Sequence, residues 1–401
     1  MSVGRKLTSV LLKQSVNVQC QRWFSAAVRL DDDEVYKRSK TAKTFLYRDL
    51  QIIRAKPEQL QQKPKPSEPL KFGQIFSDYM AEVDWTASNG WSKPVICPIH
   101  DFKLHPAAKV LHYAVEAFEG MKAYRGVDGK VRLFRPDKNM ERLKRSIARA
   151  TLPTFSFTEL LEIIKELVCL DKEWIPSGTG HALYIRPAVI GTDKQLGVSI
   201  SHEAKLFVIT GPTGPYFNSK VTLYADPSFA RSNYGPSIMI STEAQTKGCQ
   251  QVLWLYGPDE LITEVGATNI FFMWKNNHGE DELVTPPLSE GLILPGVTRE
   301  SILHLAREWK DDIKVTEKYV GMREFREAVK NKRVYEMFCS GTACVVTPVE
   351  KILYNNKQTG TIEELILPSN VKNSVMERLY KQITDIQHGK VDRPEWTQIV
   401  C

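Results

Sequence analysis

The chain has 401 residues, of which 42% are hydrophobic, so it can bury the cores of two domains and has the composition of an ordinary soluble protein. Its formal net charge of +7 falls to +3 when the four basic residues among the first 28 positions are set aside, and the remaining basic residues form no stripe. This distribution argues against a nucleic-acid partner, and no apolar run approaches the roughly 20 residues needed to span a membrane.

Residues 1–28 form a distinct basic segment. No acidic residue precedes Asp31, and Arg and Lys are spaced among Ser, Val and Leu. This composition is typical of a mitochondrial transit peptide, with a candidate processing region at Arg22–Arg29. A basic tail without a targeting role is the alternative. The transit-peptide interpretation predicts a protein of the mitochondrial matrix.

Residues 29–70 are charged and then rich in proline, which predicts an extended arm. A first domain of mixed helices and strands is expected over residues 71–210. Its predicted strands are Phe72–Trp85, Val131–Phe134, Ala182–Ile190 and Ala204–Thr210, and its predicted helices are a short one within Leu104–Tyr124 and a longer one over Asn139–Ala150.

The clearest helical pattern runs over Ser156–Leu170. Ser156 and Glu159 have the spacing of a capping box, which satisfies free amides at a helix start. Four apolar residues then recur on one helical face: Leu160, Ile163, Ile164 and Leu167. We interpret this stripe as core rather than as part of a cofactor site.

Gly and Pro crowd the segment GPTGPYFN, which predicts an interdomain linker over residues 211–219. The rest of the chain, residues 220–401, is rich in short strands and is expected to form a curled sheet or barrel-like domain wrapped by helices. Its predicted strands are Val221–Ala225, Val252–Tyr256, Asn269–Trp274 and Leu283–Thr285, and its predicted helices are Thr298–Trp309, Met322–Lys330 and Val371–Ile386. No GxGxxG or Walker-type loop is present, so a dinucleotide-binding fold is not indicated.

Seven cysteines are scattered along the chain without metal-ligand spacing. They indicate neither a disulfide framework nor a metal site, and they are typical of thiols in a reducing compartment. Cys339 and Cys344 are close enough in sequence to form a redox pair, which is an alternative to two unrelated thiols.

Three segments of the second half suggest an anion site beside a ring. In LITEVGATNIFFMW, Glu264 precedes a glycine and an apolar strand, and it is either a solvated turn residue or a carboxylate that faces an electron-poor cofactor ring. In LPGVTR, a Pro-Gly turn opens a helix whose first amides can bind an anion, although an ordinary helix start is equally compatible. In CSGTAC, Thr342 can add a hydroxyl, and Arg142 can add a charged contact from the first domain.

Seven segments together resemble the branched-chain amino acid aminotransferases, which are fold-type IV pyridoxal-phosphate enzymes. The segments are LHYAVEAFEGMKAY, LFRPDKNMERL, LYIRP, QVLWLYG, TEVGATNIFF, LPGVTR and SGTACVVTPV. The resemblance extends from about Phe72 to near the C-terminus and is strongest to animal mitochondrial members. It implies an α/β (α+β) fold with a small N-terminal α/β domain and a larger C-terminal pseudobarrel domain, a homodimer, and an active site between the domains.

The resemblance also implies the site residues. For the cofactor pyridoxal 5'-phosphate these are Arg142, Val297, Thr298 and Thr342 at the phosphate, Glu264 at the ring nitrogen and Tyr234 at the ring hydroxyl. For the substrates Leu, Ile, Val and glutamate or 2-oxoglutarate they are Phe72, Tyr113, Phe118, Tyr184, Val198 and Tyr216 as apolar walls, Arg186 for the second carboxylate of glutamate, and Ala343 for the α-carboxylate.

One departure from the family concerns its catalytic lysine. The family places its Schiff-base lysine in a glycine-rich loop shortly before the tyrosine of NYG, whereas residues 226–235 here read DPSFARSNYG. No lysine lies between Lys220 and Lys247, so no catalytic residue is assigned from the resemblance. Because that lysine is both the imine partner and the base, we expect this exact chain to be nearly inactive and to hold its cofactor non-covalently at best.

Two smaller departures lie near the site. Val345, Val346 and Thr347 follow Cys344 where mammalian members have a CxxC pair, and Ala267-Thr268 replaces a common Thr-Met pair. The sequence therefore leaves two hypotheses: a mitochondrial branched-chain transaminase, or a non-catalytic member that retains the fold and cofactor site. A related enzyme acting on D-amino acids or aminodeoxychorismate is a more distant alternative.

Overall fold

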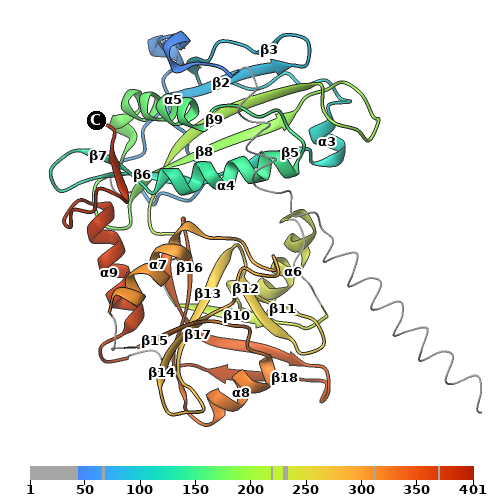
Figure 1. The fold of residues 1–401 in the computed structure, drawn as a ribbon, viewed down its shortest axis with the longest axis vertical. Coiled ribbons are helices and arrows are strands. Elements are labelled where there is room, and N and C mark those ends of the chain that lie inside the picture. The colour runs from blue at the N-terminus through green and yellow to red at the C-terminus, as the bar shows by residue number, and fades with distance from the viewer. Residues whose placement is uncertain (1–43, 66–67, 218–219, 229–233, 310–312, 369–370) are drawn as a thin grey trace, which may run out of the picture. The chain divides into compact units, whose positions relative to one another are not determined.

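The computed structural model describes residues 44–65, 68–217, 220–228, 234–309, 313–368 and 371–401, without the side chain of Tyr234. The predicted transit peptide and the first part of the predicted arm, residues 29–43, lie outside these ranges. The described residues form two large sheets with helices packed against them, which confirms the predicted α+β class (Figure 1). None of the described helices is both long and apolar enough to cross a bilayer.

The first sheet is mostly antiparallel, and its strands follow the order β1-β4-β2-β9-β8-β6-β7-β19, with β3 on β2 and β5 on β8. Its strands are β1 Gln51–Ile52, β2 Tyr79–Thr86, β3 Gly90–Trp91, β4 Val95–Pro98, β5 Glu116–Phe118, β6 Met121–Arg125, β7 Val131–Phe134, β8 Ala182–Gly191, β9 Glu203–Thr213 and β19 Thr397–Ile399. The helices of this half are α3 Lys109–Tyr113, α4 Pro136–Arg149 and α5 Phe157–Leu170.

The second sheet closes on itself. Its order is β12-β11-β10-β17-β16-β13-β14-β15, and β12 also pairs with β13, so six strands form a ring. Its strands are β10 Val221–Ala225, β11 Gln251–Tyr256, β12 Leu261–Val265, β13 Thr268–Lys275, β14 Asp281–Thr285, β15 Lys314–Glu317, β16 Val334–Gly341, β17 Val345–Asn356 and β18 Thr361–Ile366. The remaining helices are α6 Tyr234–Thr246, α7 Val297–Glu308, α8 Met322–Lys330 and α9 Val375–Gln387. The barrel-like domain predicted from the sequence is therefore present.

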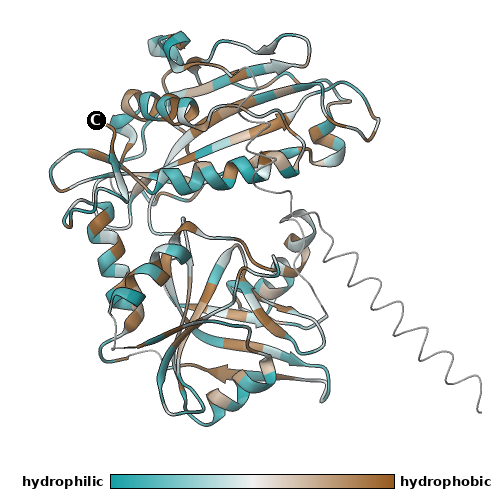
Figure 2. Ribbon diagram, viewed as in Figure 1, coloured by the Kyte–Doolittle hydropathy of each residue, from teal (hydrophilic) through white to brown (hydrophobic). Residues whose placement is uncertain are grey.

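The cores follow the expected hydrophobic patterns, with apolar residues concentrated along the strands and on the inner sides of the helices (Figure 2). In α5, Ser156 accepts a hydrogen bond from the Glu159 amide at 3.4 Å, and the predicted stripe of Leu160, Ile163, Ile164 and Leu167 is fully buried. The prediction that this stripe is core is confirmed. The Glu159 carboxylate accepts a hydrogen bond from the Tyr47 amide at 2.6 Å, which fastens the arm to this helix.

Several predicted boundaries differ from the structure. Residues 72–78 precede strand β2 instead of belonging to it, and β9 continues to Thr213, into the predicted linker. Helix α4 begins at Pro136, three residues earlier than predicted, because proline is well suited to the first turn of a helix. Helix α9 begins at Val375 instead of at residue 371. Strand β19 pairs with β7 of the first sheet, although residues 220–401 were assigned to the second domain.

A buried carboxyl beside α5 makes stability depend on pH. Asp171 is 1% exposed and accepts hydrogen bonds from Ser77 at 2.7 Å and Thr210 at 3.3 Å, and burial raises its pKa to about 7. Because the folded state binds this proton more tightly than the unfolded state, the contribution is most favourable below pH 4 and is lost as the pH rises to 7. We expect Asp171→Asn to raise the free energy of unfolding by roughly 1–3 kcal/mol at pH 8 and by much less at pH 4. Urea unfolding at both pH values measures this, and an equal gain at both would contradict the explanation.

Candidate active site

Three polar side chains form a row across neighbouring strands of the barrel. Glu264 on β12 lies opposite Asn269 on β13, and Asn269 lies opposite Ser340 on β16, so all three share one face of the sheet. Glu264 is 1% exposed, which excludes the solvated turn residue considered from the sequence. The Ser340 hydroxyl is fully buried without a hydrogen-bond partner among the described residues. A buried row of polar side chains on one sheet face indicates a binding site, because unsatisfied buried polar groups are otherwise unfavourable.

The segment before α7 is hydrogen-bonded to this row of polar side chains. The Glu264 carboxylate accepts a hydrogen bond from the Leu294 amide at 2.9 Å, and Asn269 donates to the Leu294 carbonyl at 2.9 Å. A Cβ at Gly296 would lie 2.1 Å from the Asn269 amide oxygen, so this turn requires glycine. Gly296 caps α7 without a side chain, and Val297 and Thr298 are buried in its first turn. The helix dipole there stabilises a nearby anion by about 0.3–1 kcal/mol.

Arg142 on α4 reaches the same turn from the first sheet. Its guanidinium donates to the Pro295 carbonyl at 3.3 Å. It also donates to both oxygens of Glu119, at 2.5 and 2.7 Å, and Glu119 accepts a further hydrogen bond from Asn139 at 2.9 Å. The structure thus brings Arg142 to the predicted phosphate position, where it is already engaged by a buried carboxylate that the sequence analysis did not identify.

The CSGTAC segment forms a tight turn between β16 and β17. Gly341 pairs with Val345 across the two strands, and a Cβ at Gly341 would lie 3.1 Å from the Thr268 methyl group. The turn residues Thr342 and Ala343 are partly exposed. The Ala343 carbonyl accepts a hydrogen bond at 2.8 Å from Lys122 on β6, a residue that the sequence analysis also missed.

Four of the predicted substrate-binding residues form an aromatic cluster around Arg186. The ring of Phe72 lies 4.7 Å from that of Tyr184 and 5.6 Å from that of Tyr216. The Arg186 guanidinium lies 4.5 Å above the Phe118 ring and donates to the Tyr184 hydroxyl at 2.9 Å. The Tyr184 hydroxyl also lies against Gly120, between β5 and β6, where a Cβ would be only 2.1 Å from it.

Tyr113, at the end of α3, and Val198, between β8 and β9, are both exposed. The Tyr113 hydroxyl donates to the Leu196 carbonyl, and Val198 is 87% exposed. Leu111 and Ile200 are also more than half exposed, so α3 and the segment 196–200 together present an apolar surface. These two residues therefore lie on an exposed patch of the single chain, and their role as substrate-binding residues stays a prediction.

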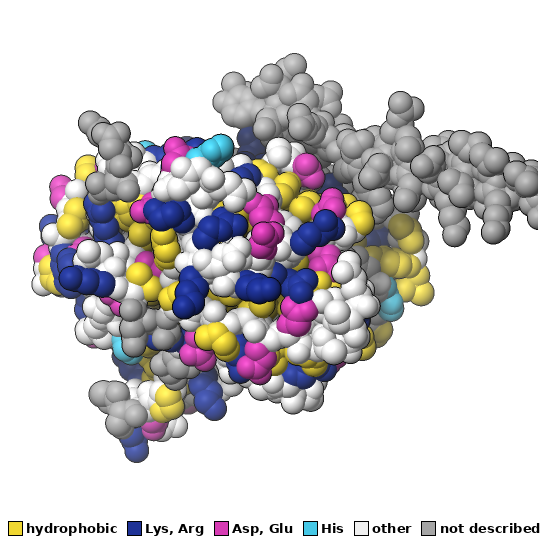
Figure 3. Space-filling view, turned by 90° about the horizontal axis from the view of Figure 1, so that it is seen from below, with side chains coloured by type: hydrophobic (Ala, Val, Ile, Leu, Met, Phe, Trp, Pro, Cys, Tyr) yellow, Lys and Arg dark blue, Asp and Glu magenta, His cyan; other side chains and the backbone are white. Residues whose placement is uncertain are grey.

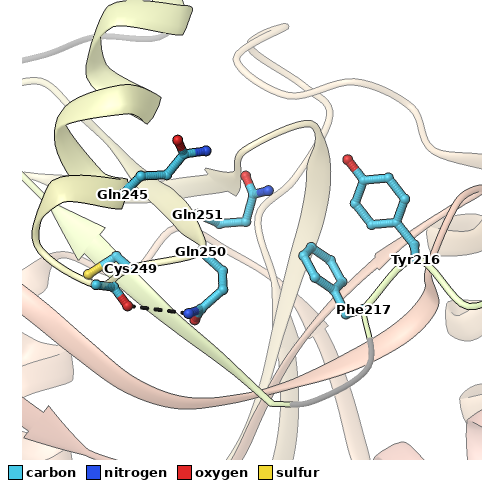
Figure 4. Close-up of a pocket in the computed structure, with 7 residues that line it drawn as sticks. Tyr216, Phe217, Gln245, Cys249, Gln250 and Gln251 are labelled. Atoms are coloured by element: carbon cyan, nitrogen blue, oxygen red, sulfur yellow. Dashed lines mark hydrogen bonds between the residues drawn. The ribbon is translucent and has the colours of Figure 1, made fainter. Parts of the chain in front are cut away.

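An open cavity of about 470 Å³ adjoins the aromatic cluster. Tyr216 and Phe217 line one side, and Gln245, Gly248, Cys249, Gln250 and Gln251 line the other, with Gln250 donating to the Gly248 carbonyl at 3.3 Å (Figure 4). Among the predicted site residues whose side chains are described, Tyr216 is the one that lines it. Gln251 also packs against Gly266, where a Cβ would lie 1.9 Å from the Gln251 side-chain oxygen. Because Gly266 directly follows β12, the cavity borders the strand that carries Glu264.

The two cysteines of the turn region lie together as free thiols. Cys339 pairs across the strands with Thr347, and its thiol is hydrogen-bonded to that of Cys344. This hydrogen bond lowers the pKa of Cys344 and, together with burial, raises the pKa of Cys339. Whether they form a redox pair stays a prediction.

Comparison with known proteins assigns the family. The family described as amino-transferase class IV matches residues 116–352. A cytosolic branched-chain-amino-acid aminotransferase of Caenorhabditis elegans is 49% identical over 97% of this chain and 98% of its own length. The mitochondrial enzyme of Rattus norvegicus is 47% identical over 86% of this chain and 90% of its own length. The chain belongs to the branched-chain-amino-acid aminotransferases of class IV.

The structure of this class IV aminotransferase is also similar to that of a branched-chain amino acid aminotransferase from Thermobaculum terrenum in its PLP form. The TM-score is 0.62 at 21% identity, covering 82% of this chain and all of that one. The resemblance inferred from the motifs and the fold class that it implied are therefore confirmed. Tyr234 begins α6, but its side chain and residues 229–233, where the family lysine is missing, lie outside the described residues.

Proposed function

We propose that this aminotransferase moves the amino group of Leu, Ile or Val to 2-oxoglutarate, giving glutamate and the branched 2-oxo acids. The observation that carries the substrate assignment is the setting of Arg186. Aromatic rings of Phe118 and Tyr184 flank its guanidinium, and its Nε is buried without a hydrogen-bond partner among the described residues. This cluster therefore offers both an apolar surface for an aliphatic branch and a cation for a carboxylate.

Pyridoxal 5'-phosphate is the proposed cofactor, and the described residues fit it. The buried Glu264 carboxylate is suited to hold a ring nitrogen protonated, and the start of α7, with Thr342 and Arg142, is suited to a phosphate. When bound, this group supplies an electron sink for the carbanion at the substrate Cα. The buried Ser340 hydroxyl, which lies in the same row as Glu264, would gain a partner when the site is filled.

Residues of the chain would bind the phosphate, the ring hydroxyl and the substrate. Arg142, Val297, Thr298 and Thr342 would bind the phosphate, and Tyr234 would donate to the ring hydroxyl. The amide of Ala343 would orient the substrate α-carboxylate, while the rings of Phe72, Tyr184 and Tyr216 would exclude water from the substrate side chain. Because the family lysine is absent, the sequence predicts that phosphate and ring contacts hold the cofactor without a covalent link.

Replacing Arg186 tests the substrate assignment without relying on turnover. We expect Arg186→Met to weaken 2-oxoglutarate binding roughly 10–100-fold, because a charge-assisted hydrogen bond contributes about 1.5–3 kcal/mol. The 2-oxo acid of leucine, which lacks the second carboxylate, should bind almost unchanged. Titration calorimetry of the protein loaded with pyridoxamine phosphate measures both. Equal losses for the two acids would show that Arg186 only supports the fold.

A homodimer in the mitochondrial matrix is proposed as the working state. The apolar patch formed by Leu111, Tyr113, Leu196, Val198 and Ile200 supports self-association, since large exposed apolar patches mark interaction sites. Relatives with both mitochondrial and cytosolic names match the chain, so the location rests on the composition of residues 1–28. On the face shown in Figure 3, acidic and basic side chains are interspersed.

A further inference from the structure

Lys122 is a buried lysine that no prediction above uses. It lies on β6, is 3% exposed, and pairs across the strands with Tyr184, so the two side chains share one face of the sheet. Its ammonium group reaches the Ala343 carbonyl at 2.8 Å. Lys122 therefore lies between the aromatic cluster around Arg186 and the turn that carries Thr342.

The surroundings of Lys122 differ from those of the other fully buried lysine in the described residues, Lys109. Lys109 forms an ion pair with Asp193 at 3.4 Å and hydrogen bonds to Ser199 and Ile200. No carboxylate among the described residues forms an ion pair with Lys122. Burial lowers the pKa of Lys122 to about 8, since a low-dielectric site disfavours the charged form, while the neighbouring Cys344 thiol opposes this shift. About a tenth of this amine is therefore neutral and nucleophilic at pH 7, and most of it is neutral at pH 9.

We propose that Lys122 replaces the missing family lysine as the covalent anchor of the cofactor. The neutral Nζ attacks the aldehyde carbon of pyridoxal phosphate and forms a carbon–nitrogen double bond, while the carbonyl oxygen leaves as one water molecule. No oxidant or reductant is needed, because the two protons of the neutral amine leave with the carbonyl oxygen in that water molecule. This inference rests on the proposed function and revises the expectation of purely non-covalent binding.

The position of Lys122 supports this role over a structural one. A lysine that only fastened the turn to β6 would be more stable with a carboxylate partner, as Lys109 has. Lys122 instead contacts a backbone carbonyl of the turn proposed to bind both the phosphate and the substrate carboxylate. Lys247, the first lysine after the missing loop, is less suitable, since it forms an ion pair with Glu243 at 2.9 Å.

Borohydride trapping tests the proposal. The purified full chain is incubated with pyridoxal phosphate, reduced, digested and analysed by mass spectrometry, alongside Lys122→Arg and the matched control Lys247→Arg. We expect a reduced adduct on Lys122 in the parent and in Lys247→Arg, and at least a tenfold loss of adduct in Lys122→Arg. The labelling rate should rise about tenfold from pH 7 to pH 9, because the amine deprotonates across that range.

Binding of pyridoxamine phosphate separates this proposal from the proposed function, because that compound has no aldehyde and cannot form the bond. If pyridoxamine phosphate binds the parent, Lys122→Arg and Lys247→Arg, the cofactor site and the fold of the two variants are intact. An adduct on a different lysine, or none, would then overturn the role of Lys122 while leaving the function in place. If it binds none of them, both the cofactor assignment and the inference fail.

Discussion

Leucine-dependent glutamate formation by this chain is expected to be about 10²–10⁴-fold slower than by a variant with a lysine-bearing, glycine-rich segment inserted directly before Asn233. No lysine lies between Lys220 and Lys247, so the family position for the base is empty. Lys122 can supply a covalent anchor, but it is fastened to the Ala343 carbonyl, and proton transfer requires a base placed at the substrate Cα. The residual rate should fall further in Lys122→Arg.

The matched control for this experiment carries the same insertion with arginine in place of lysine. It restores the length and flexibility of the segment but not a titratable amine, so its rate of glutamate formation should equal that of the parent. A coupled assay with leucine and 2-oxoglutarate measures all three proteins. A parent rate equal to that of the lysine insertion would show that the missing loop is not needed, and that the expectation of near-inactivity is wrong.

The second large effect is on stability. Arg142→Ala should reduce the free energy of unfolding by about 3 kcal/mol, because it leaves the Glu119 carboxylate buried without its cation. Glu119 is 2% exposed, and Asn139 and the Gly120 amide are its remaining described partners. Because Glu119 and a phosphate compete for the same guanidinium, the loss should be accompanied by weaker binding of pyridoxamine phosphate.

The double variant Glu119→Gln with Arg142→Met is the control for this explanation. Removing both charges avoids an unpaired buried ion, so the double variant should be more stable than Arg142→Ala alone. Denaturant unfolding of the parent and the two variants provides the comparison. If the double variant is as unstable as the single one, the effect comes from lost packing of the arginine stem.

Sequence patterns predicted the helices and strands that depend on interactions between residues close together in the chain. Helix α5 and strand β7 follow from a capping box with one apolar stripe and from a short apolar run before a proline. The row of Glu264, Asn269 and Ser340 depends instead on the register of three strands, and periodicity does not encode which residues face each other. Lys122 was missed because four of the five residues of β6 are buried, so the strand lacks the alternation that would separate its two faces.

Helix α6 was missed for a related reason. Polar and apolar residues are mixed around its axis, and Ile238 and Met239 are largely exposed, so no stripe marks it as a helix. Tertiary packing through Ile240 and Ala244, which are buried against β11 residues, determines it instead. Such long-range determinants are not visible in a single sequence.

The pairing of β19 with β7 has a consequence for how the chain matures. Gln398 lies opposite Leu133, and the Cys169 thiol donates to the Val400 carbonyl across 231 positions of sequence. While the ribosome is still making the barrel, β7 is an uncovered edge with unpaired backbone groups. The strand that covers this edge emerges only after the barrel strands and α9 have been synthesised. During that interval the nascent chain is open to pairing with other chains, so its yield in cells should depend on chaperones that shield this edge.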